Sequence, residues 1–537
     1  MSGELTAPLL GKTSVASRLR RVAPLAALVV LGAAGVAAVR WASRLGIGVG
    51  YDSMFYLTAA ESLLHGQGLR WAAGGGEFKP LIHYPPLYPS LLAGVAGSGL
   101  NMVEAAAWTS ALLFGLNIIL PGLLTYWITR SLPAGLGVAA VVLFSPVMVE
   151  VHLEAMSEPL FLLFLVVALG MLAEHGQRGG VRSVVLAGVA AGLAYLTRYV
   201  GLTLIVGGLG AIALWSNLPV GRRFRDLIIF GGISLVPVLG WSARNLALTG
   251  SASNRVLNLH PISRTALRQA ADTLSGWLLP ESIDLRMRIA VLTMATGVGL
   301  FLFWKALRAT REAQGARGDD GLALSCFRIC LGFVSVYAAG LVTSLLFFDA
   351  STRFTDRILS PVHLVLLILA VVGVARLPKS WRWPASALVI LLGVSYAWRS
   401  WVVLDHARVN GLAFNSRSWR SSDTIRWVAG LPAGTLIYSN EAFPIQFLTG
   451  HPAYWAPEQV DSVKGTIRPD YEEQVALMRT RLHQPGSVLV IFTGSHYRVE
   501  LPPLEELTRG LVRIGATGDG LIFVDPVNLG AFERPSG

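Results

Sequence analysis

The chain of 537 residues is 53% hydrophobic, only 14% charged, and carries a formal net charge of +12. Soluble globular proteins contain about 25% charged residues, so this composition excludes a soluble enzyme, a fibrous protein and a disordered protein. Apolar runs of about 17–25 residues recur along the chain, and this length crosses the hydrocarbon core of a bilayer. The sequence therefore predicts a polytopic membrane protein, whose excess of Lys and Arg is explained by cytoplasmic loops rather than by nucleic-acid binding.

A polar and basic N-terminal segment, residues 1–21, precedes the first apolar run at 22–39. This order is also that of a secretory signal peptide, but the length of the apolar run and the number of later spans favour an uncleaved first helix. We expect about eleven transmembrane helices in total. The other ten lie near residues 104–128, 133–150, 158–174, 181–197, 199–215, 226–242, 288–306, 322–347, 358–375 and 384–402.

The basic connectors between these runs all fall on one side of the membrane. Because Lys and Arg are retained in the cytoplasm during insertion, they predict a multi-pass protein of the cell membrane with a cytoplasmic N-terminus. Three long pieces then lie outside: the loop at 40–103, the loop at about 243–287 and the tail after about 403. The residues that set this orientation are Arg130, Arg178, Arg182, Arg222, Arg223, Arg225, Arg308, Arg311, Arg317, Arg376, Lys379 and Arg382.

The tail is more polar than the rest of the chain and changes its pattern. Strand-like runs at 434–439, 487–493 and 511–524 alternate with helix-like segments at 419–430 and 469–483. Such alternation is typical of a small α/β domain. We therefore expect a transmembrane domain over 22–403 and an extracytoplasmic α/β domain over 404–537, with no glycine fingerprint for a nucleotide.

Ionisable residues gather in the outer loops and at the outer ends of the expected helices. Charges at membrane depth are costly, so they commonly face a polar cavity, although single arginines also extend to lipid headgroups. Carboxylates beside arginines suit an anionic ligand such as a phosphate, together with proton chemistry at a carboxylate. The residues concerned are Asp52, Glu61, Lys79, His83, Glu150, His152, Glu154, Glu158, Arg198, Arg244, Asp349, Arg353, Asp356 and Arg357.

Several short motifs occur in a recognisable order. The chain reads YDSMFYL at 51–57, YPPLYP at 84–89, SEPLF at 157–161 and GLAYLTRY at 192–199, followed by Arg244-Asn245 and by Asp356-Arg357 ahead of Pro361. Over residues 20–400 this order resembles the GT-C membrane glycosyltransferases. The most similar branch is family 39-like, which includes the protein mannosyltransferases and the aminoarabinose transferases.

The resemblance implies a bundle of many helices with the active site between the first outer loop and the membrane surface. It implies a sugar donor on a polyprenyl phosphate, an acceptor (lipid, glycan or protein) handled on the outer face, and inversion of the anomeric carbon. Asp52 matches the loop aspartate of the family, so we expect it to be the catalytic base, with an N-cap of the following helix as the alternative. In the aminoarabinose branch the position before the double proline is usually lysine; Tyr84 stands here, which argues against that sugar.

The remaining roles follow from charge type and from the same resemblance. For the donor phosphate we expect Arg198, Arg353, Arg357, Arg244 and Lys79, and for the acceptor or sugar Glu154, Glu158, His83, Tyr84 and Tyr88. Glu158 lies in the first turn of an expected helix, where it could instead favour the helix dipole. No cofactor is certain, but Asp52 and Glu158 have the oxygen ligands that a divalent cation prefers.

Two other functions compete with this interpretation. A secondary transporter would also place charges within a helical bundle, but it often shows internal repeats and sites near the midplane, and no repeat is visible here. A polysaccharide polymerase or ligase would use similar polyprenyl-linked substrates. The convergence of Asp52, Glu158, Arg198 and Arg353 on one cavity would favour the transferase.

Overall fold

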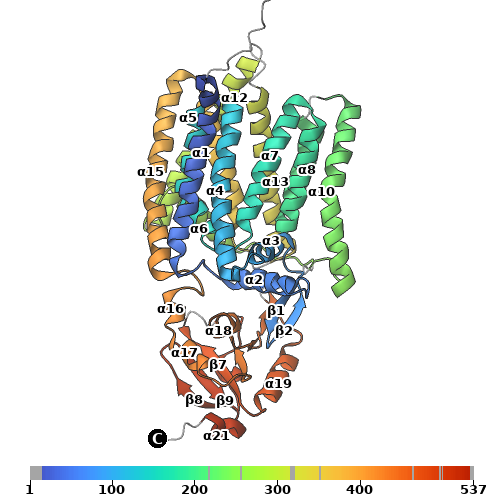
Figure 1. Ribbon diagram of the computed structural model, residues 1–537, viewed down its shortest axis with the longest axis vertical. Coiled ribbons are helices and arrows are strands. Elements are labelled where there is room, and N and C mark those ends of the chain that lie inside the picture. The colour runs from blue at the N-terminus through green and yellow to red at the C-terminus, as the bar shows by residue number, and fades with distance from the viewer. Residues whose placement is uncertain are drawn as a thin grey trace, which may run out of the picture.

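The computed structural model describes residues 15–215, 218–253, 257–314, 321–349, 352–461, 465–494, 498 and 500–532. These residues form a long helical bundle with a smaller α/β region at one end (Figure 1). The bundle accounts for most of the chain up to residue 410. We call residues 411–532 the C-terminal region.

The bundle is built from long apolar helices. In the described part of the chain, eight helices are long and apolar enough to cross a membrane, and the bent pair of α5 and α6 would make a ninth. The helices of the whole bundle, which include the shorter α8 and α9, are α1 (Val15–Ala42), α4 (Met102–Thr129), α5 (Leu132–Phe144), α6 (Pro146–His152), α7 (Glu158–Arg178), α8 (Val181–Thr197), α9 (Leu202–Trp215), α10 (Val220–Thr249), α12 (Leu285–Gln314), α13 (Gly321–Phe347), α14 (Asp356–Arg376) and α15 (Lys379–Asn410).

Nine of the eleven expected spans each lie within one of these helices, and the other two, at 133–150 and 199–215, are also mostly helical. This confirms the expected fold class. The expected count exceeds eight or nine because α8 and the segment Tyr199–Trp215, which contains α9, are apolar but shorter helices. The expected span at 133–150 is divided between α5 and α6, which meet at an angle of 60°. The bend has a local cause: Pro146 lacks a backbone N–H and begins α6, while the Ser145 hydroxyl accepts from the backbone N–H of Met148.

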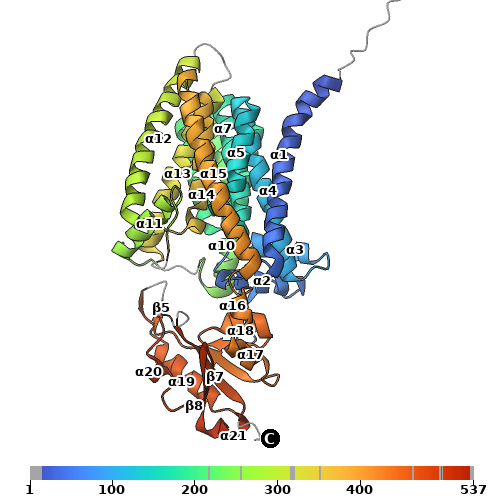
Figure 2. The same ribbon diagram turned by 90° about the vertical axis from the view of Figure 1, so that its left-hand side faces the viewer.

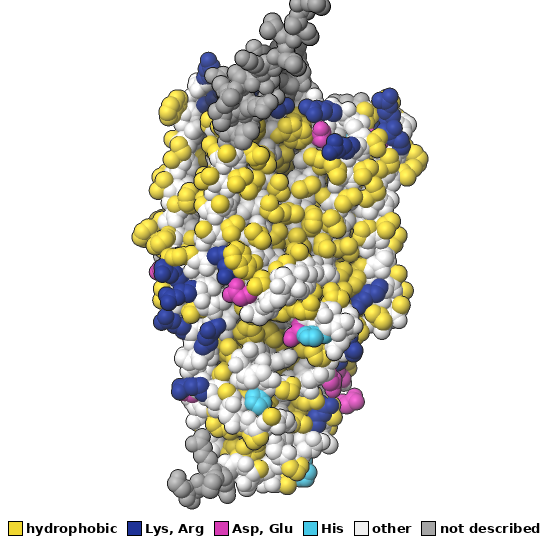
Figure 3. Space-filling view, viewed as in Figure 1, with side chains coloured by type: hydrophobic (Ala, Val, Ile, Leu, Met, Phe, Trp, Pro, Cys, Tyr) yellow, Lys and Arg dark blue, Asp and Glu magenta, His cyan; other side chains and the backbone are white. Residues whose placement is uncertain are grey.

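The outer surface of the bundle is apolar. Hydrophobic side chains cover its middle, and Lys and Arg side chains gather toward its ends (Figure 3). On α15, for example, Leu391 and Trp398 are 68% and 69% exposed. Exposure of such a surface to water is unfavourable, whereas contact with the hydrocarbon of a bilayer is favourable. This distribution supports a bundle that spans a membrane, and the side on which its termini lie stays a prediction.

The segment between α1 and α4 folds against one end of the bundle, beside the C-terminal region (Figures 1 and 2). It contains the helix α2, an antiparallel hairpin of β1 and β2, and the helix α3. A second connecting segment, between α10 and α12, contains α11 (Arg264–Gly276). The bounds of the first segment are η1 (Ser43–Leu45), α2 (Tyr51–Leu64), β1 (Arg70–Gly74), β2 (Glu77–Pro80) and α3 (Leu87–Ala96).

The C-terminal region contains a five-stranded sheet with the order β4-β3-β7-β9-β8. β3 runs parallel to both β4 and β7, and β9 runs antiparallel to β7 and β8. β7 is buried along its whole length, as expected for a strand at the centre of a sheet. The elements are α16 (Arg417–Arg420), α17 (Asp423–Ala429), β3 (Leu436–Ser439), α18 (Ala442–Thr449), β4 (Ala453–Trp455), β5 (Val460–Asp461), β6 (Thr466–Ile467), α19 (Tyr471–Leu482), β7 (Ser487–Phe492), α20 (Leu504–Leu507), β8 (Val512–Ala516), β9 (Gly520–Val524), η4 (Pro526–Asn528) and α21 (Leu529–Phe532).

Backbone contacts join the C-terminal region to the first connecting segment at two places. Val49, just before α2, forms a parallel bridge with Ala413, just after α15. At the tip of the β1–β2 hairpin, the backbone N–H of Gly75 donates to the carbonyl of Ala453 on β4 at 2.9 Å. Gly75 has φ +57°, and a Cβ atom there would lie only 1.9 Å from the Tyr454 ring. The close approach of the hairpin to β4 therefore requires glycine.

Candidate active site

A large cavity of about 1530 Å³ lies where the bundle, the first connecting segment and the C-terminal region meet. One part of its wall is apolar and belongs to the bundle, where Leu202 and Val206 of α9 face Val336 and Gly340 of α13. The part near the first connecting segment is polar and aromatic. The cavity thus joins an apolar channel between two helices to a charged chamber at the end of the bundle.

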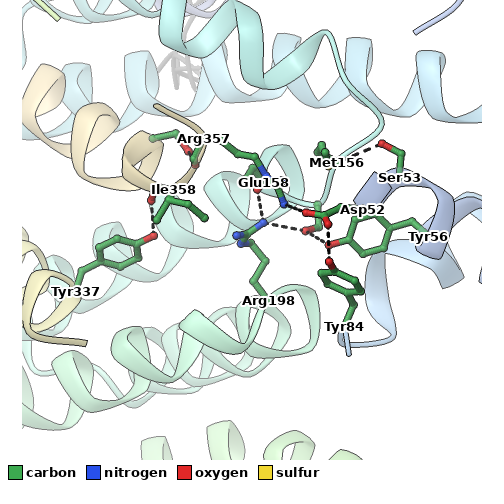
Figure 4. Close-up of polar contacts among 12 residues, drawn as sticks. Asp52, Ser53, Tyr56, Tyr84, Met156, Glu158, Arg198, Tyr337, Arg357 and Ile358 are labelled. Atoms are coloured by element: carbon green, nitrogen blue, oxygen red, sulfur yellow. Dashed lines mark hydrogen bonds and ion pairs between the residues drawn. The ribbon is translucent and has the colours of Figure 1, made fainter. Parts of the chain in front are cut away.

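Asp52 lies in the wall of this charged chamber. It is the second residue of α2, and its side chain is 28% exposed. Its Oδ1 accepts a hydrogen bond from the Tyr84 hydroxyl at 2.7 Å, and its Oδ2 lies 2.5 Å from Nη2 of Arg357 (Figure 4). The N-cap of α2 is Gly50 rather than Asp52, so the alternative expectation of a helix cap is wrong.

Glu158 lies beneath the chamber and is almost completely buried, with 1% of its surface exposed. Its Oε1 forms ion pairs with both Arg198 and Arg357 (Figure 4). Arg198 also donates to the Ser157 hydroxyl at 3.2 Å, and Ser157 contacts the Tyr56 hydroxyl at 3.0 Å. Burying a carboxylate is expensive unless it is paired, and these two arginines supply the pairing.

Arg357 connects the two carboxylates. It is the second residue of α14, and its guanidinium bonds Asp52 on one side and Glu158 on the other. A guanidinium thus occupies the position between the two residues that we considered for a divalent cation. The described residues contain no group of three or more His, Cys, Asp and Glu side chains that could hold a metal ion.

The other expected phosphate contacts separate into two kinds. Arg353 and Lys79 are exposed and line the large cavity, and neither forms an ion pair with another described residue. Arg244 does not line it. Its guanidinium donates to the carbonyls of Leu81 at 2.7 Å and Leu69 at 3.3 Å, and stacks on Trp241 at 4.4 Å. The geometry gives Arg244 a structural contact that ties the β1–β2 hairpin to α10.

The expected acceptor residues also separate. His83 and Tyr84 line the large cavity, whereas Tyr88 is completely buried, with its ring 5.1 Å from that of Tyr56. Burial and the neighbouring Asp52 carboxylate raise the pKa of Tyr84 well above its ordinary value. The Tyr84 phenol therefore stays protonated and serves as a donor to Asp52.

Glu154 lies in the wall of a second, smaller cavity of about 480 Å³. It belongs to the turn between α6 and α7, and a backbone bridge to Gly48 holds it beside the start of α2. Burial raises the pKa of its carboxyl group. The residues around the small cavity are Gly50, Tyr51, Asp52, Glu154, Met156, Arg357, Ala413, Phe414 and Trp419.

Three residues, Tyr51, Asp52 and Arg357, line both cavities. They form the wall between the two spaces, which we call the shared wall. Asp52 is the carboxylate of this wall, and a group that enters either cavity can approach it. An arrangement of this kind suits a reaction between two molecules that meet at one base.

The C-terminal region contributes residues that sequence reasoning missed, since we expected only an accessory domain there. Its side of the large cavity carries aromatic and basic side chains. The region also contacts the shared wall, because the Tyr51 hydroxyl donates to the two carboxylate oxygens of Glu441 at 2.7 and 2.5 Å. Burial raises the pKa of Glu441 to about 7. No motif marks these positions; the available signal was the tail's content of Trp, Tyr and Arg. The aromatic and charged lining residues of this region are Tyr438, Phe443, Tyr454, Trp455, Glu458, Arg468, Arg481 and Arg498.

Comparison with known proteins relates this arrangement to a family. The family model described as dolichyl-phosphate-mannose-protein mannosyltransferase matches residues 76–241, and no curated protein matches the sequence. Among solved structures, ArnT from Cupriavidus metallidurans in the apo state is 16% identical, with 93% of this chain and 98% of that chain covered and a TM-score of 0.50.

Two larger proteins have a similar fold. The oligosaccharyltransferase AglB from Archaeoglobus fulgidus, in complex with an inhibitory peptide and a dolichol-phosphate, is 12% identical over 88% of this chain and 70% of that chain, with a TM-score of 0.50. The arabinofuranosyltransferase AftD from Mycobacteria is 16% identical over 93% of this chain and 41% of that chain, with a TM-score of 0.52. At these identities the structures show the fold alone. Together with the family model they confirm the resemblance to the GT-C glycosyltransferases that the sequence motifs indicate.

Proposed function

We propose that this protein is an integral-membrane glycosyltransferase that moves a sugar from a polyprenyl-phosphate donor to a hydroxyl group of an acceptor, with inversion of the anomeric carbon. The observation that carries the proposal is the position of Asp52. Its partly exposed carboxylate lies in the wall of the large cavity, which also contains Arg198, Arg353 and Arg357.

The large cavity has the two properties that a polyprenyl-phosphate sugar requires. The apolar channel between α9 and α13 suits a prenyl chain, and the charged chamber suits a phosphate. Arg198 and Arg357 pair with the two carboxylates Asp52 and Glu158. Arg353 lines the same cavity and pairs with no other described residue, so positive charge remains for an anion. The bound dolichol-phosphate of AglB and the name of the matching family model support the same class of donor.

The proposed chemistry needs few protein groups. A phosphate is a good leaving group, so no strong general acid is required; positive charge that stabilises it as it departs is sufficient. The bond between the anomeric carbon and the phosphate oxygen breaks, and its electron pair stays on the phosphate. The acceptor oxygen forms the new bond to that carbon from the opposite side and loses its proton to Asp52.

The carboxylate of Asp52 has free lone-pair positions that can accept this proton. An ionised carboxylate offers about four lone-pair positions, and Tyr84 and Arg357 each occupy one. These two contacts fix the orientation of the carboxylate and leave acceptor positions for a hydroxyl group. A base must lie within hydrogen-bond reach of the proton that it takes, and the partial exposure of Asp52 permits this.

We further propose that both cavities and the C-terminal region lie on the outer face of the cell membrane and that the N-terminus is cytoplasmic. The basic connectors of the sequence support this orientation. Labelling of single cysteines in intact cells tests it. A cysteine at the exposed position Ser418 should react with a membrane-impermeant maleimide, and one at the exposed position Arg182 should not; the reverse pattern would contradict the orientation.

The direct test of the activity uses the purified full-length protein in lipid nanodiscs. It is incubated with polyprenyl phosphates that carry mannose, glucose, arabinose or aminoarabinose, with and without candidate acceptors. We expect release or transfer of one sugar by the wild type and a loss of about 10²–10⁴-fold in Asp52→Asn, the usual contribution of a general base. Glu61→Gln, an exposed carboxylate on the same helix, is the control and should retain full turnover.

Two results would contradict the proposal. Equal turnover in Asp52→Asn and the wild type would remove Asp52 from the chemistry. No turnover of any donor, together with ion-driven solute uptake into vesicles, would identify a transporter instead.

A further inference from the structure

The small cavity differs in chemistry from the large one, although both contain Asp52. It is lined by the turn before α7, by the start of α2, by Arg357 of α14 and by the segment that follows α15. Its volume of about 480 Å³ is within the range of sites for small organic molecules, about 300–1,000 Å³. It is therefore large enough for a ligand of its own.

The small cavity does not suit the polyprenyl-phosphate donor. Arg357 is its only lining arginine or lysine among the described residues, and that guanidinium is already bonded to Asp52 and Glu158. None of its lining residues belongs to the apolar channel between α9 and α13. A phosphate would lack a free positive charge there and would lie near the Glu154 carboxylate.

Glu154 gives the small cavity a carboxylate that can accept hydrogen bonds from a ligand. Its side chain forms no hydrogen bond or ion pair with another described residue, although the carboxylates on either side of it, Asp52 and Glu158, are both paired. A half-buried carboxylate without a protein partner is left to accept hydrogen bonds from a ligand. Hydroxyl groups are suitable donors for it.

The rest of the small cavity is aromatic and apolar. Phe414 packs edge-on against Tyr51 with ring centres 5.2 Å apart, and against Trp419 at 5.8 Å. Met156 and Ala413 complete this wall. A sugar ring combines an apolar face of C–H groups with a rim of hydroxyl groups, which matches an aromatic wall beside a carboxylate. A peptide would bring backbone amides for which these side chains offer few partners.

We infer that the small cavity is the acceptor site and that the acceptor is a neutral carbohydrate, namely a sugar residue of a glycan. Glu154 binds its hydroxyl groups, and its apolar face packs on the exposed ring of Tyr51, which the buried rings of Phe414 and Trp419 support. This inference rests on the proposed function for the direction of transfer. The binding of a neutral sugar in the small cavity can nevertheless be measured without any turnover.

The experiment compares two variants that act on the small cavity in different ways. Glu154→Gln keeps the size of the side chain but removes its charge. Gly50→Leu fills the cavity: Gly50 has φ −103°, and a Cβ atom there would meet only Met156, at 4.0 Å, so a larger side chain fits the backbone. Glu61→Gln is again the matched control.

Binding is measured first, on the full-length protein in nanodiscs, by saturation-transfer NMR with mannobiose, cellobiose, maltose and arabinobiose. We expect at least one disaccharide to bind the wild type and Glu61→Gln. Its affinity should fall about tenfold or more in Glu154→Gln, the effect of losing a hydrogen bond to a charged group, and binding should be absent in Gly50→Leu. Undecaprenyl phosphate should bind all four proteins equally.

Turnover then separates this inference from the proposed function. With an active donor, the KM for the disaccharide should rise about tenfold or more in Glu154→Gln, while the KM for the donor stays unchanged. Disaccharide binding that Gly50→Leu abolishes, without turnover of any donor, would support the sugar site and contradict the transferase. Transfer that prefers a Ser/Thr peptide or a phosphorylated lipid, or disaccharide binding that is equal in all four proteins, would overturn the inference.

Discussion

The two cavities share one wall but differ in nearly everything else. The large cavity is basic and opens into an apolar channel of the bundle, whereas the small cavity has one carboxylate without a partner and an aromatic wall. Under the proposed function, one carboxylate serves two unlike ligands. Residues away from the shared wall would select each ligand, and only Tyr51, Asp52 and Arg357 would need to suit both.

The difference between a paired and an unpaired carboxylate is clearest in two glutamates that are four residues apart in the chain. Glu158 is buried and paired with two arginines, and Glu154 faces the small cavity without a partner. Glu158→Gln removes a buried charge partner: the partly buried Arg198 loses its carboxylate, and Arg357 keeps only Asp52. We therefore expect it to lower the free energy of unfolding by about 3 kcal/mol, the lower end of the usual cost of breaking a buried ion pair. Thermal unfolding in nanodiscs measures the loss.

Glu154→Gln is the control for this measurement and should unfold within about 0.5 kcal/mol of the wild type, as substitutions away from paired or packed features do. If the two variants were equally stable, the distinction between a paired structural carboxylate and a free ligand-binding one would fail.

The second prediction concerns the large cavity alone. Arg353 lines it and pairs with no other described residue, so Arg353→Gln should raise the KM for the donor by about 10–100-fold, the worth of a charge-assisted hydrogen bond. Disaccharide binding should not change. Arg182→Gln, exposed at the opposite end of α8 from Arg198, is the control; an equal effect of both substitutions would indicate loss of general surface charge instead.

The third prediction concerns the shared wall. Tyr84→Phe removes the hydroxyl that donates to Oδ1 of Asp52 and leaves the ring. Because a hydrogen bond to a charged group is worth about 1.5–3 kcal/mol, we expect kcat to fall by about 10–100-fold, with the KM values for donor and acceptor both unchanged. A selective change in either KM would place Tyr84 in one cavity rather than in the wall between them.

The smallest expected effect is on pH dependence. Burial raises the pKa of Glu441, which Tyr51 and Arg498 face, from 4.5 to about 7. A carboxyl with a raised pKa stabilises the folded state while it is protonated. Its contribution is complete below about pH 4.5 and is lost as the pH rises through about 7.

The midpoint of thermal unfolding should therefore decrease between pH 5 and pH 8 in the wild type. In Glu441→Gln this decrease should be smaller, because the amide does not titrate. A pH profile identical in both proteins would show that Glu441 does not control the contact between the C-terminal region and the shared wall.

Much of the fold could be predicted because hydropathy is a local property. Each apolar run of membrane length became a helix, and the charges at the helix ends near residues 52, 158, 198 and 357 met at one end of the bundle. Which of these charged side chains bond to one another could not be predicted in the same way. The bonds of Arg357 to Asp52 and Glu158, and that of Tyr84 to Asp52, depend on side-chain positions that no spacing encodes.

Two further features could not be predicted for the same reason. Arg244 was expected at the phosphate because of its charge, but its bonds to the carbonyls of Leu69 and Leu81 depend on where the hairpin lies. The small cavity was not foreseen at all. Its wall brings Tyr51 against Phe414, more than 360 residues away in the chain, and such a contact leaves no periodic or compositional trace.

The junction between Val49 and Ala413 has an evolutionary consequence. One wall of the small cavity comes from the short segment 413–419, which joins the last helix of the bundle to the sheet, and this segment adds nothing to the large cavity. Substitutions in it reshape one cavity without altering the other. Under the proposed function, substitutions in this connecting segment would change the acceptor, while the helices that line the donor cavity stay unchanged.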